Sequence, residues 1–391
     1  MDGQVVVDSA AWPEPKARPR NEAVQNGVLK VECITDRARF VALQEEWDAL
    51  VERTDDQVFY RHAFFRVWLD NFAPRADLRV FTVRDGTGRL VAALPLLWAR
   101  MRLHGVPVRV LAACANEHSC RFDLLAEDGE AAAKVLLPAL LAQGDRDLIR
   151  LTDVPDGGRA YALLQKAQQA QLLHGTWVSL VSPYVPLPSS LDALQKSLDS
   201  KFRANLRRRR KRLGEKGRVT LERVTGGLSL PAQVEEGMAL EASGWKGRGG
   251  TAMAQDPSTR GFYLELARTM AAEGRLALWF MRLDGRAVGF HYALEHGGKY
   301  LLLKPGYDEA IRECSPGQLL MEDVLSDCVS RGLGEFDFLG IDMPWKRDWT
   351  DRVREHRWLF IFRGNAFGRG LHALKFRFGP RVREMVKTWK R

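Results

Sequence analysis

The pattern of apolar and polar positions along the chain predicts an α/β protein. Short runs with strand composition alternate with segments in which apolar residues recur every three or four positions, as they do on one face of a helix. Up to residue 186 the predicted order is β-α-α-β-β-β-α-β-α-β. Its strands are 29–34, 78–83, 90–98, 106–112, 148–151 and 176–181, and its helices are 38–51, 62–72, 130–142 and 161–171.

The same order of elements then restarts. Pro183, Pro186 and Pro188 predict a linker, after which a helical segment runs from Ser190 into a basic stretch. The remaining strands are predicted at 219–224, 276–283, 287–295, 299–304, 335–339 and 357–362, with helices at 232–242, 257–273 and 317–330. There is no close sequence repeat, but the repeated order predicts two similar domains in tandem, each a mixed central sheet flanked by helices.

The two ends of the chain differ from these domains. Residues 1–27 are rich in Pro, Ala and charge and lack periodicity, so we expect a disordered tail. The domains should then span 28–186 and 187–362. In 363–391 apolar residues fall on one helical face and basic residues on the other, which predicts a basic amphipathic helix. Such a helix fits an anionic membrane surface, but a stripe packed on the protein's own core fits equally well.

Composition and charge narrow the class. The 391 residues are 46% hydrophobic and 28% charged, which suits two or three globular domains and excludes wholesale disorder. The net charge of +10 is concentrated in two segments. Residues 201–218 hold ten basic residues and one acid, and residues 363–391 hold nine and one. Such segments attract polyanions, although a solvated helix face is the commoner role of a charge run.

Several classes are excluded or disfavoured. No run approaches about 20 apolar residues, so no transmembrane helix is expected. The N-terminus lacks an apolar segment after a basic start, which disfavours a secretory signal. Five sparse cysteines without a C-x-x-C pair suit a reducing compartment, and scattered histidines do not suggest a metal site. We expect a cytoplasmic protein. The C-terminal helix allows a peripheral attachment to the inner face of the cytoplasmic membrane as an alternative.

Three local motifs carry possible chemistry. In the first, Ser315-Pro316-Gly317-Gln318-Leu319 leads from a strand into a helix, and its N–H groups suit a phosphate, although an ordinary capped helix is the simpler explanation. The second is the Gly-rich basic loop 241–252, which could close over a substrate or stay a flexible solvent loop. In the third, Asp337 lies within an apolar strand, where it needs a role or a structural partner such as Arg or Lys.

These motifs occur in an order that resembles a known family. The segments that carry the resemblance are Leu198–Arg208, Trp245-Lys246-Gly247, Lys304-Pro-Gly-Tyr307-Asp308, Ser315–Leu320, and Asp337-Phe-Leu-Gly340 followed by Trp345-Lys346. Together they resemble the BioF2-like (CelD/BcsL-type) branch of the GNAT acyltransferase superfamily, related in fold to the Fem peptidyltransferases. The resemblance is strongest over 190–362. Over 28–186 only the order of elements agrees.

The resemblance implies an N-acyltransferase with two GNAT-like domains. The acyl group would pass from acyl-CoA, as a co-substrate, to a primary amine, without a metal or a permanently bound cofactor. The acceptor could be an amino sugar of an exopolysaccharide or a long-chain amine such as a sphingoid base. The alternative is a Fem-type aminoacyl-tRNA-dependent peptidyltransferase. We rank this alternative second. A segment that binds RNA usually has aromatic residues that stack on the bases, and the basic segment 201–218 contains only one, Phe202.

Site residues follow from the motifs and from the chemistry of amine acylation. His291 is the best general base by type, although a lone histidine is more often a core residue, and Asp337 could orient it or act as base itself. Tyr307 could protonate the leaving thiolate, and Lys304 could stabilise the oxyanion or meet an acidic acceptor. Cys314 shows no setting that favours a thiolate.

Binding residues are assigned to two further groups. For the donor we predict Ser315, Gly317, Gln318 and Leu319, although the usual GNAT pyrophosphate loop with several glycines is absent. For the acceptor we predict Glu241, Trp245 and Lys246.

Overall fold

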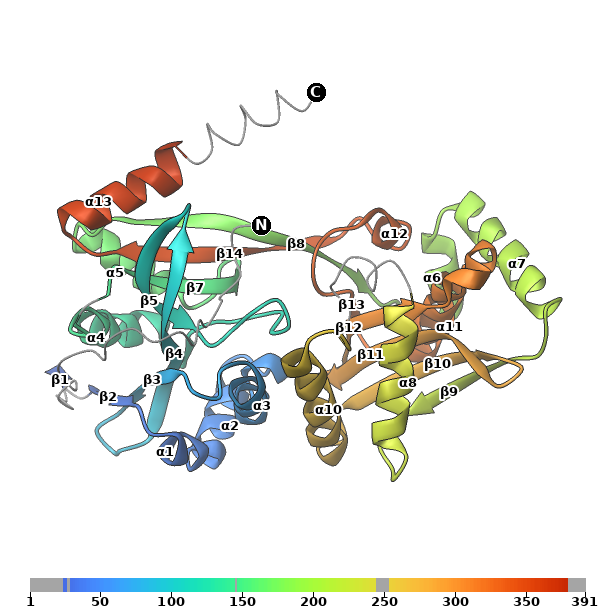
Figure 1. Ribbon diagram of the computed structural model, residues 1–391, viewed down its shortest axis with the longest axis horizontal. Helices are drawn as coiled ribbons and strands as arrows, with labels where there is room; N and C mark the ends of the chain where they lie inside the picture. The colour runs from blue at the N-terminus through green and yellow to red at the C-terminus, as the bar shows by residue number, and fades with distance from the viewer. Residues whose placement is uncertain (1–23, 27–28, 145, 244–252, 379–391) are drawn as a thin grey trace. The chain divides into compact units, whose positions relative to one another are not determined.

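A computed structural model describes residues 24–26, 29–144, 146–243 and 253–378 (Figure 1). The chain divides into two compact units. Unit 1 comprises the chain up to residue 69, residues 73–180 and the chain from 355 onwards. Unit 2 comprises residues 70–72 and 181–354.

Unit 1 is a mixed sheet with helices. Its strand order is β1 (Val24–Asn26), β2 (Leu29–Ile34), β3 (Asp77–Arg84), β4 (Leu90–Leu103), β5 (Val106–Ala113), β7 (Leu148–Pro155), β14 (Val353–Phe362) and β8 (His174–Pro186), and β6 (Leu125–Ala126) pairs with β4. Its helices are α1 (Arg37–Val41), α2 (Gln44–Arg53), α3 (His62–Phe72), α4 (Gly129–Leu141), α5 (Tyr161–Gln169) and α13 (Ala366–Ala373). The pair β5–β7 is parallel, while β2, β3, β4 and β5 pair antiparallel.

Unit 2 repeats this plan. Its strand order is the end of β8, then β13 (Glu335–Asp337), β12 (Lys299–Tyr307), β11 (Arg286–His296), β10 (Leu276–Leu283) and β9 (Val219–Val224). Its helices are α6 (Leu191–Ser197), α7 (Ser200–Gly214), α8 (Leu230–Ala242), α10 (Pro257–Ala272), α11 (Pro316–Ser330) and the short α12 (Pro344–Arg347), with the 3₁₀ segment η2 at Glu309–Cys314. The side chains of Asp199 and Asp256 cap α7 and α10 by accepting backbone N–H groups of the first turn.

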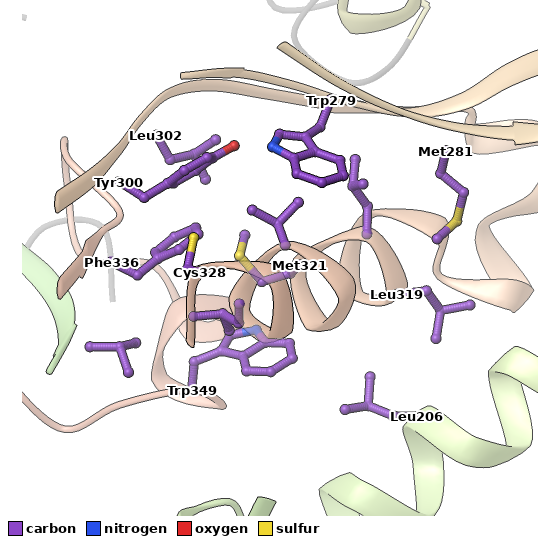
Figure 2. Packing of buried hydrophobic residues seen from close by; sticks show 14 of the residues in the cluster. Leu206, Trp279, Met281, Tyr300, Leu302, Leu319, Met321, Cys328, Phe336 and Trp349 are labelled. Atoms are coloured by element: carbon purple, nitrogen blue, oxygen red, sulfur yellow. The ribbon is translucent and has the colours of Figure 1, made fainter. Parts of the chain in front are cut away.

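Helices α8 and α11 cover opposite faces of the unit 2 sheet. Gly237 of α8 lies against the Phe290 ring, and a Cβ on Gly289 would lie 3.3 Å from Leu320 of α11. Gly289 and Phe290 are neighbours in β11, and successive residues of a strand point to opposite faces. Figure 2 shows the core on the α11 side, where Trp279, Tyr300 and Phe336 from the sheet meet α11.

The predicted α/β class and most predicted elements are confirmed. Helix α3 spans the predicted 62–72, and the two predicted hairpins of unit 2 form as β10–β11 and β11–β12. The prediction of a linker at the prolines was wrong for Pro183 and Pro186, which lie inside β8. A proline is tolerated there because it lacks only the N–H donor, and the Pro183 carbonyl still accepts the Phe338 N–H at 3.2 Å.

The unit boundaries differ from the two consecutive ranges expected from sequence. The end of the chain returns to unit 1, since β14 pairs antiparallel with β7 from His356 to Phe362. The strand predicted at 357–362 was therefore assigned to the second domain, but its hydrogen-bonded partner belongs to unit 1. Strand β1 lies within the range 1–27 that we assigned to a tail, and residues 1–23 lie outside the described residues.

The predicted C-terminal helix is present as α13, continued by a π-helical turn at Leu374–Phe378. Leu371 is buried as its apolar stripe predicts, whereas Phe367 and Phe378 of the same stripe are 44% and 54% exposed. Lys375 does not lie on an open basic face. It is 4% exposed, with Nζ 4.8 Å from the Trp177 ring centroid, because a lysine stem can pack over aromatics. Residues 379–391 lie outside the described residues.

Candidate functional site

Strands β12 and β13 are paired over only part of their length, so that one end of β12 extends beyond β13. They pair in parallel only at Lys299–Leu301 with Glu335–Asp337, and β13 ends there while β12 continues to Tyr307. A register shift between Tyr292 and Ala293 marks a bulge in the β11–β12 ladder just before this extension. A strand edge without its neighbour presents backbone N–H and C=O groups to a ligand, and bulges re-aim side chains. The candidate site is this end of β12, which we call the free end because it is not paired with β13.

On one side of the free end lie residues from the helices α8 and α10. The Lys304 ammonium is 5.5 Å from the ring centroid of Tyr263 in α10. A Cβ on Gly306 would lie 3.0 Å from the Cα of Glu241, so glycine allows the end of α8 to approach β12. The Glu241 side chain is buried, and its Oε2 accepts the Met253 N–H at 2.9 Å. The structure thus brings Lys304 and Glu241 to the same face of β12.

On the other side lies the start of α11. A Cβ on Gly317 would lie 3.3 Å from Cδ1 of Tyr307, so the tyrosine ring rests against the first turn of the helix. Ser315 precedes the helix in a left-handed conformation (φ 48°), and its side chain makes no capping hydrogen bond. Its carbonyl instead accepts the N–H groups of Gln318 and Leu319, at 3.0 and 3.2 Å. Among the described residues no hydrogen bond is seen from the Gly317 N–H, which is therefore the donor left for a ligand at this helix start.

Gln318 and Leu319 are held by other contacts. Gln318 Oε1 accepts the Trp349 Nε1–H at 2.7 Å, and the Trp349 ring packs edge-on against Phe202 of α7. Leu319 is fully buried in the core of unit 2 (Figure 2). These two residues shape the first turn of α11 from within, so of the predicted donor residues Gly317 is the one whose backbone lies beside Tyr307.

Asp337 has the structural partner that the sequence left open. Its Oδ2 accepts a hydrogen bond from Arg354 Nη1 at 2.6 Å, and its Oδ1 accepts the Leu339 N–H at 2.8 Å. Arg354 also pairs with Glu335 at 2.6 Å and lies 3.8 Å from the Tyr184 ring centroid. Burial opposes the charge of Arg354, but Glu335 and Asp337 outweigh it and raise the pKa of the guanidinium.

His291 lies in the core. Its ring is 1% exposed, its Nδ1 is 3.3 Å from the Tyr300 hydroxyl, and its Nε2 makes no hydrogen bond within the described residues. Burial lowers the pKa of His291 to about 3, so the ring is neutral at physiological pH. It points to the α11 face of the sheet, whereas Lys304 and Glu241 lie on the α8 face.

Lys346 shows why Trp345-Lys346 follows Asp337 in the motif. Its buried Nζ donates to the carbonyls of Leu339 and Ile341, at 2.6 and 2.7 Å. Leu339 and Gly340 both have left-handed backbone (φ 48° and 57°). Asp337 and Lys346 thus hold the turn by which the chain leaves β13. Beyond this turn β12 continues without pairing with β13. The sequence analysis missed the roles of Gly306, Lys346 and Arg354, although the first two lie within the quoted motifs.

Three further predictions concern the acceptor residues of the 241–252 loop, the reactivity of Cys314, and metal or membrane-spanning segments. Trp245 and Lys246 lie outside the described residues. Burial, the largest effect, raises the pKa of the Cys314 thiol, in line with the low nucleophilicity expected of it. Among the described residues no group of three or more His, Cys, Asp or Glu is placed to hold a metal ion, and no helix is long and apolar enough to cross a membrane.

Comparison with known families shows to which family the chain belongs. The sequence profile described as "Acetyltransferase (GNAT) domain" matches residues 16–127 and 200–347. The chain belongs to this family. A search of curated proteins finds no match.

Several solved structures are similar to this GNAT protein over 85–86% of its chain. FemX matches with a TM-score of 0.56 at 13% identity, over 85% of this chain and 98% of FemX. L-PGS from Bacillus licheniformis matches with 0.51 at 11% identity, over 86% and 95%. A conserved protein of unknown function from Bacteroides thetaiotaomicron matches with 0.53 at 12% identity, over 85% and 99%. With the family match, they confirm the predicted fold of tandem GNAT-like domains.

Membership of the GNAT family indicates the general type of reaction, but not the substrates. An acyltransferase of this fold needs an acyl donor and an amine acceptor. The free end of β12 has two distinct sides for two reactants. Its last residues alternate between the α8 face, with Lys304 and Gly306, and the α11 face, with Tyr307.

Proposed function

We propose that the protein transfers an acyl group from acyl-CoA to a primary amine at the free end of β12. The observation that carries the proposal is the alternation along this strand end. Tyr307 faces the start of α11, while Lys304 and Gly306 face the end of α8, where Glu241 lies. A thioester lying along β12 would have a phosphate-compatible helix start on one side and a buried carboxylate on the other.

The donor is assigned to the α11 side. Gly317 has no side chain to keep a phosphate away, and its N–H adds to the positive end of the helix dipole. The backbone of β12 beyond Leu301 is not paired with β13, and we place the CoA arm along this edge, as an added strand would lie. We keep the predicted placement of the donor pyrophosphate near Gly317 and Gln318.

The acceptor is assigned to the α8 side. The amine nitrogen attacks the thioester carbonyl carbon, a C–N bond forms, and the C–S bond breaks. The proton lost by the amine passes to Glu241, and the leaving thiolate takes a proton from Tyr307. Lys304 is placed on the amine side, where its charge stabilises the oxyanion.

This assignment moves the base away from His291 and Asp337. A base with a pKa of about 3, as His291 has, takes a proton from an ammonium poorly at neutral pH. Asp337 is engaged with Arg354 and with the Leu339 N–H. In our proposal Asp337 fixes the turn after β13, and His291 packs in the core.

The acceptor is proposed to be an amino sugar of an exopolysaccharide or a long-chain amine such as a sphingoid base. A buried glutamate suits the cationic form of either amine, so the distinction must come from experiment. The second candidate function is transfer from aminoacyl-tRNA, as in Fem-type enzymes. It is supported by the exposed cations of α7 at Arg207, Arg208, Lys211 and Arg212, which form a face suited to a phosphate backbone.

A thiol-release assay separates the two candidates. Purified protein is offered acetyl-CoA or a long-chain acyl-CoA, with glucosamine or a sphingoid base as acceptor. We expect amine-dependent release of CoA with at least one pair, and Glu241→Gln should lower kcat by about 100-fold or more because the base is lost. Release with none of the pairs, together with tRNA binding that needs the α7 arginines, would replace the first candidate by the second.

A further inference from the structure

Helix α7 contains an uninterrupted run of cations. Every residue from Arg207 to Arg212 is an arginine or a lysine, and the helix contains no acid. Arg210 pairs with Glu322 and Asp323 of α11, at 2.7 and 2.8 Å. The other cations of the run have no carboxylate partner within ion-pair distance among the described residues. Like charges three and four positions apart in a helix repel each other, and an anion that lies against the run would relieve this repulsion.

One side of α7 borders the segment that leads into α11. Arg212 follows Arg208 by four positions and Arg209 by three, so the three side chains are neighbours on one side of the helix. Arg212 Nη1 donates a hydrogen bond to the Glu313 carbonyl at 3.2 Å. Glu313 lies two residues before Ser315, where α11 is about to begin. This side of α7 therefore lies next to the start of α11.

A second contact places Arg209 near the first turn of α11. Burial raises the pKa of Asp348, and the charge of Arg209 acts against this rise, which shows that the two charged groups are near each other. Asp348 Oδ2 lies 3.5 Å from Nε2 of Gln318, in the first turn of α11. The proposed pyrophosphate site at Gly317 and Gln318 thus has an arginine of α7 in its surroundings.

The three arginines can be reached from solvent. Arg208 and Arg212 are exposed, and Arg209 is half-buried. The hydrogen bond of Arg208 goes to the neutral amide oxygen of Asn205, at 2.7 Å, so its charge is not compensated there. A ligand that lies on the surface beside α11 can therefore contact their guanidinium groups without entering a cavity.

The acids near this side of α7 do not cancel its charge. Glu215 caps the helix at its end, and the carboxylate of Glu313 pairs with Lys216 at 3.1 Å. Asp348 is the third acid, near Arg209. Three carboxylates thus lie near the three arginines and Lys216, which leaves a positive excess.

Helix α7 offers charge to a ligand and little else. Its one aromatic residue, Phe202, is 9% exposed and packs edge-on against Trp349. Leu206 and Leu213 are buried in the core of unit 2, where Figure 2 shows Leu206. A helix that lies in a membrane interface needs an exposed apolar face, and a platform for single-stranded RNA needs exposed rings. The observations favour a small ligand that carries several phosphate groups.

We propose that Arg208, Arg209 and Arg212 bind the nucleotide end of acyl-CoA, above all its 3′-phosphate. This inference rests on the proposed function, in which the donor pyrophosphate lies at the start of α11. The guanidinium fork matches a pair of phosphate oxygens, so arginines suit this task better than lysines. The enzyme then selects a donor with the complete nucleotide over a thioester of pantetheine alone.

Calorimetric titration of the full chain with CoA, dephospho-CoA and pantetheine tests this selection. Dephospho-CoA lacks the 3′-phosphate, and pantetheine lacks the whole nucleotide. We expect CoA to bind at least about tenfold more tightly than dephospho-CoA, because charge-assisted hydrogen bonds to the 3′-phosphate are lost, and pantetheine to bind most weakly. Added salt should narrow the difference between CoA and dephospho-CoA, since the arginines are open to solvent.

The double variant Arg209→Gln/Arg212→Gln locates the site. Its affinity for CoA should fall about tenfold or more, to near that for dephospho-CoA, while its affinity for dephospho-CoA should change less. Arg207→Gln/Lys211→Gln is the matched control. It removes the same charge from the same helix, but these two residues lie four positions apart on a different side, and it should keep the preference for CoA. The unfolding midpoint of each variant shows that it is folded.

The outcomes separate this inference from the proposed function. Equal wild-type affinities for CoA and dephospho-CoA, or an unchanged preference in Arg209→Gln/Arg212→Gln, overturn the inference and leave acyl-CoA as the donor. Absence of CoA binding by the wild type overturns the proposed function as well. Loss of tRNA binding in Arg209→Gln/Arg212→Gln with unchanged CoA affinity would assign α7 to the second candidate function and likewise overturn the inference.

Discussion

The end of helix α8 meets strand β12 at Glu241 and Gly306, where a Cβ on the glycine would lie 3.0 Å from the glutamate Cα and 3.2 Å from its backbone nitrogen. The neighbour is backbone, which cannot turn aside as a side-chain tip can. The close approach of the end of α8 to the end of β12 thus depends on the absence of a side chain at residue 306.

Gly306→Ala should therefore move the two elements apart. We expect a loss of about 1–3 kcal/mol in stability from overpacking and a larger relative loss of kcat than of acyl-CoA affinity. The control is Gly334→Ala, in the same unit, where an added Cβ meets nothing within 4 Å. Chemical denaturation and steady-state kinetics of the two variants test this, and an active, equally stable Gly306→Ala would contradict it.

The ion pair of Asp337 with Arg354 gives a second prediction. Asp337→Ala leaves a guanidinium with one partner fewer and removes the acceptor of the Leu339 N–H, so we expect a loss of about 3–5 kcal/mol in stability. Glu335→Gln keeps the buried carboxylate of Asp337 and should cost clearly less. If Asp337→Ala unfolds at the wild-type denaturant concentration but loses all turnover, Asp337 is catalytic and our structural assignment is wrong.

His291 predicts a pH dependence of stability. Its pKa in the folded protein, about 3, lies below the value of about 6.5 in an unfolded chain. The unfolded state therefore binds the proton first, and stability falls as pH drops below about 6.5, by up to about 1.4 kcal/mol per pH unit. The difference in unfolding midpoint between wild type and His291→Gln should shrink as pH falls from 7 to 4. A constant difference would mean that His291 does not titrate with folding.

The C-terminal segment gives a fourth prediction. Phe367 and Phe378 are exposed apolar side chains in a strongly basic part of the chain, a combination that favours an anionic membrane surface. We expect salt-sensitive binding to anionic liposomes that Phe367→Ser with Phe378→Ser reduces several-fold. Leu371→Ala is the contrasting variant, because Leu371 is buried and its truncation should lower stability instead. Absence of liposome binding by the intact chain would leave α13 with a packing role alone.

The elements with strong periodicity could be predicted from the sequence. Helix α3 also forms over the predicted 62–72, a run without Gly or Pro that ends before Pro74. Strand β8 was cut short because prolines normally end strands, but here they lack only donors that the ladder does not need. The return of β14 to unit 1 has no local sequence signal, because a strand's composition does not name its partner.

The sequence predicted several residues of the candidate site, but it did not predict what each of them does. Lys304, Tyr307 and Gly317 stand in the motifs, and the structure brings them to one strand end. Asp337 and His291 were assigned chemistry by residue type. Their roles depend on partners and burial, and Arg354 lies 17 residues from Asp337, outside any local pattern.

The affinity of Gly317→Val for acyl-CoA, measured by calorimetry, tests most directly the claim that the acyl donor lies along β12 at the start of α11. A Cβ at this position would lie 3.3 Å from the Tyr307 ring, and a valine would also cover the free N–H of the helix start. Gly214→Val is the matched control, because that glycine at the end of α7 has open space around it. The account predicts at least a tenfold loss of affinity in Gly317→Val and wild-type affinity in the control. Wild-type affinity in Gly317→Val as well would place the donor elsewhere and contradict the account.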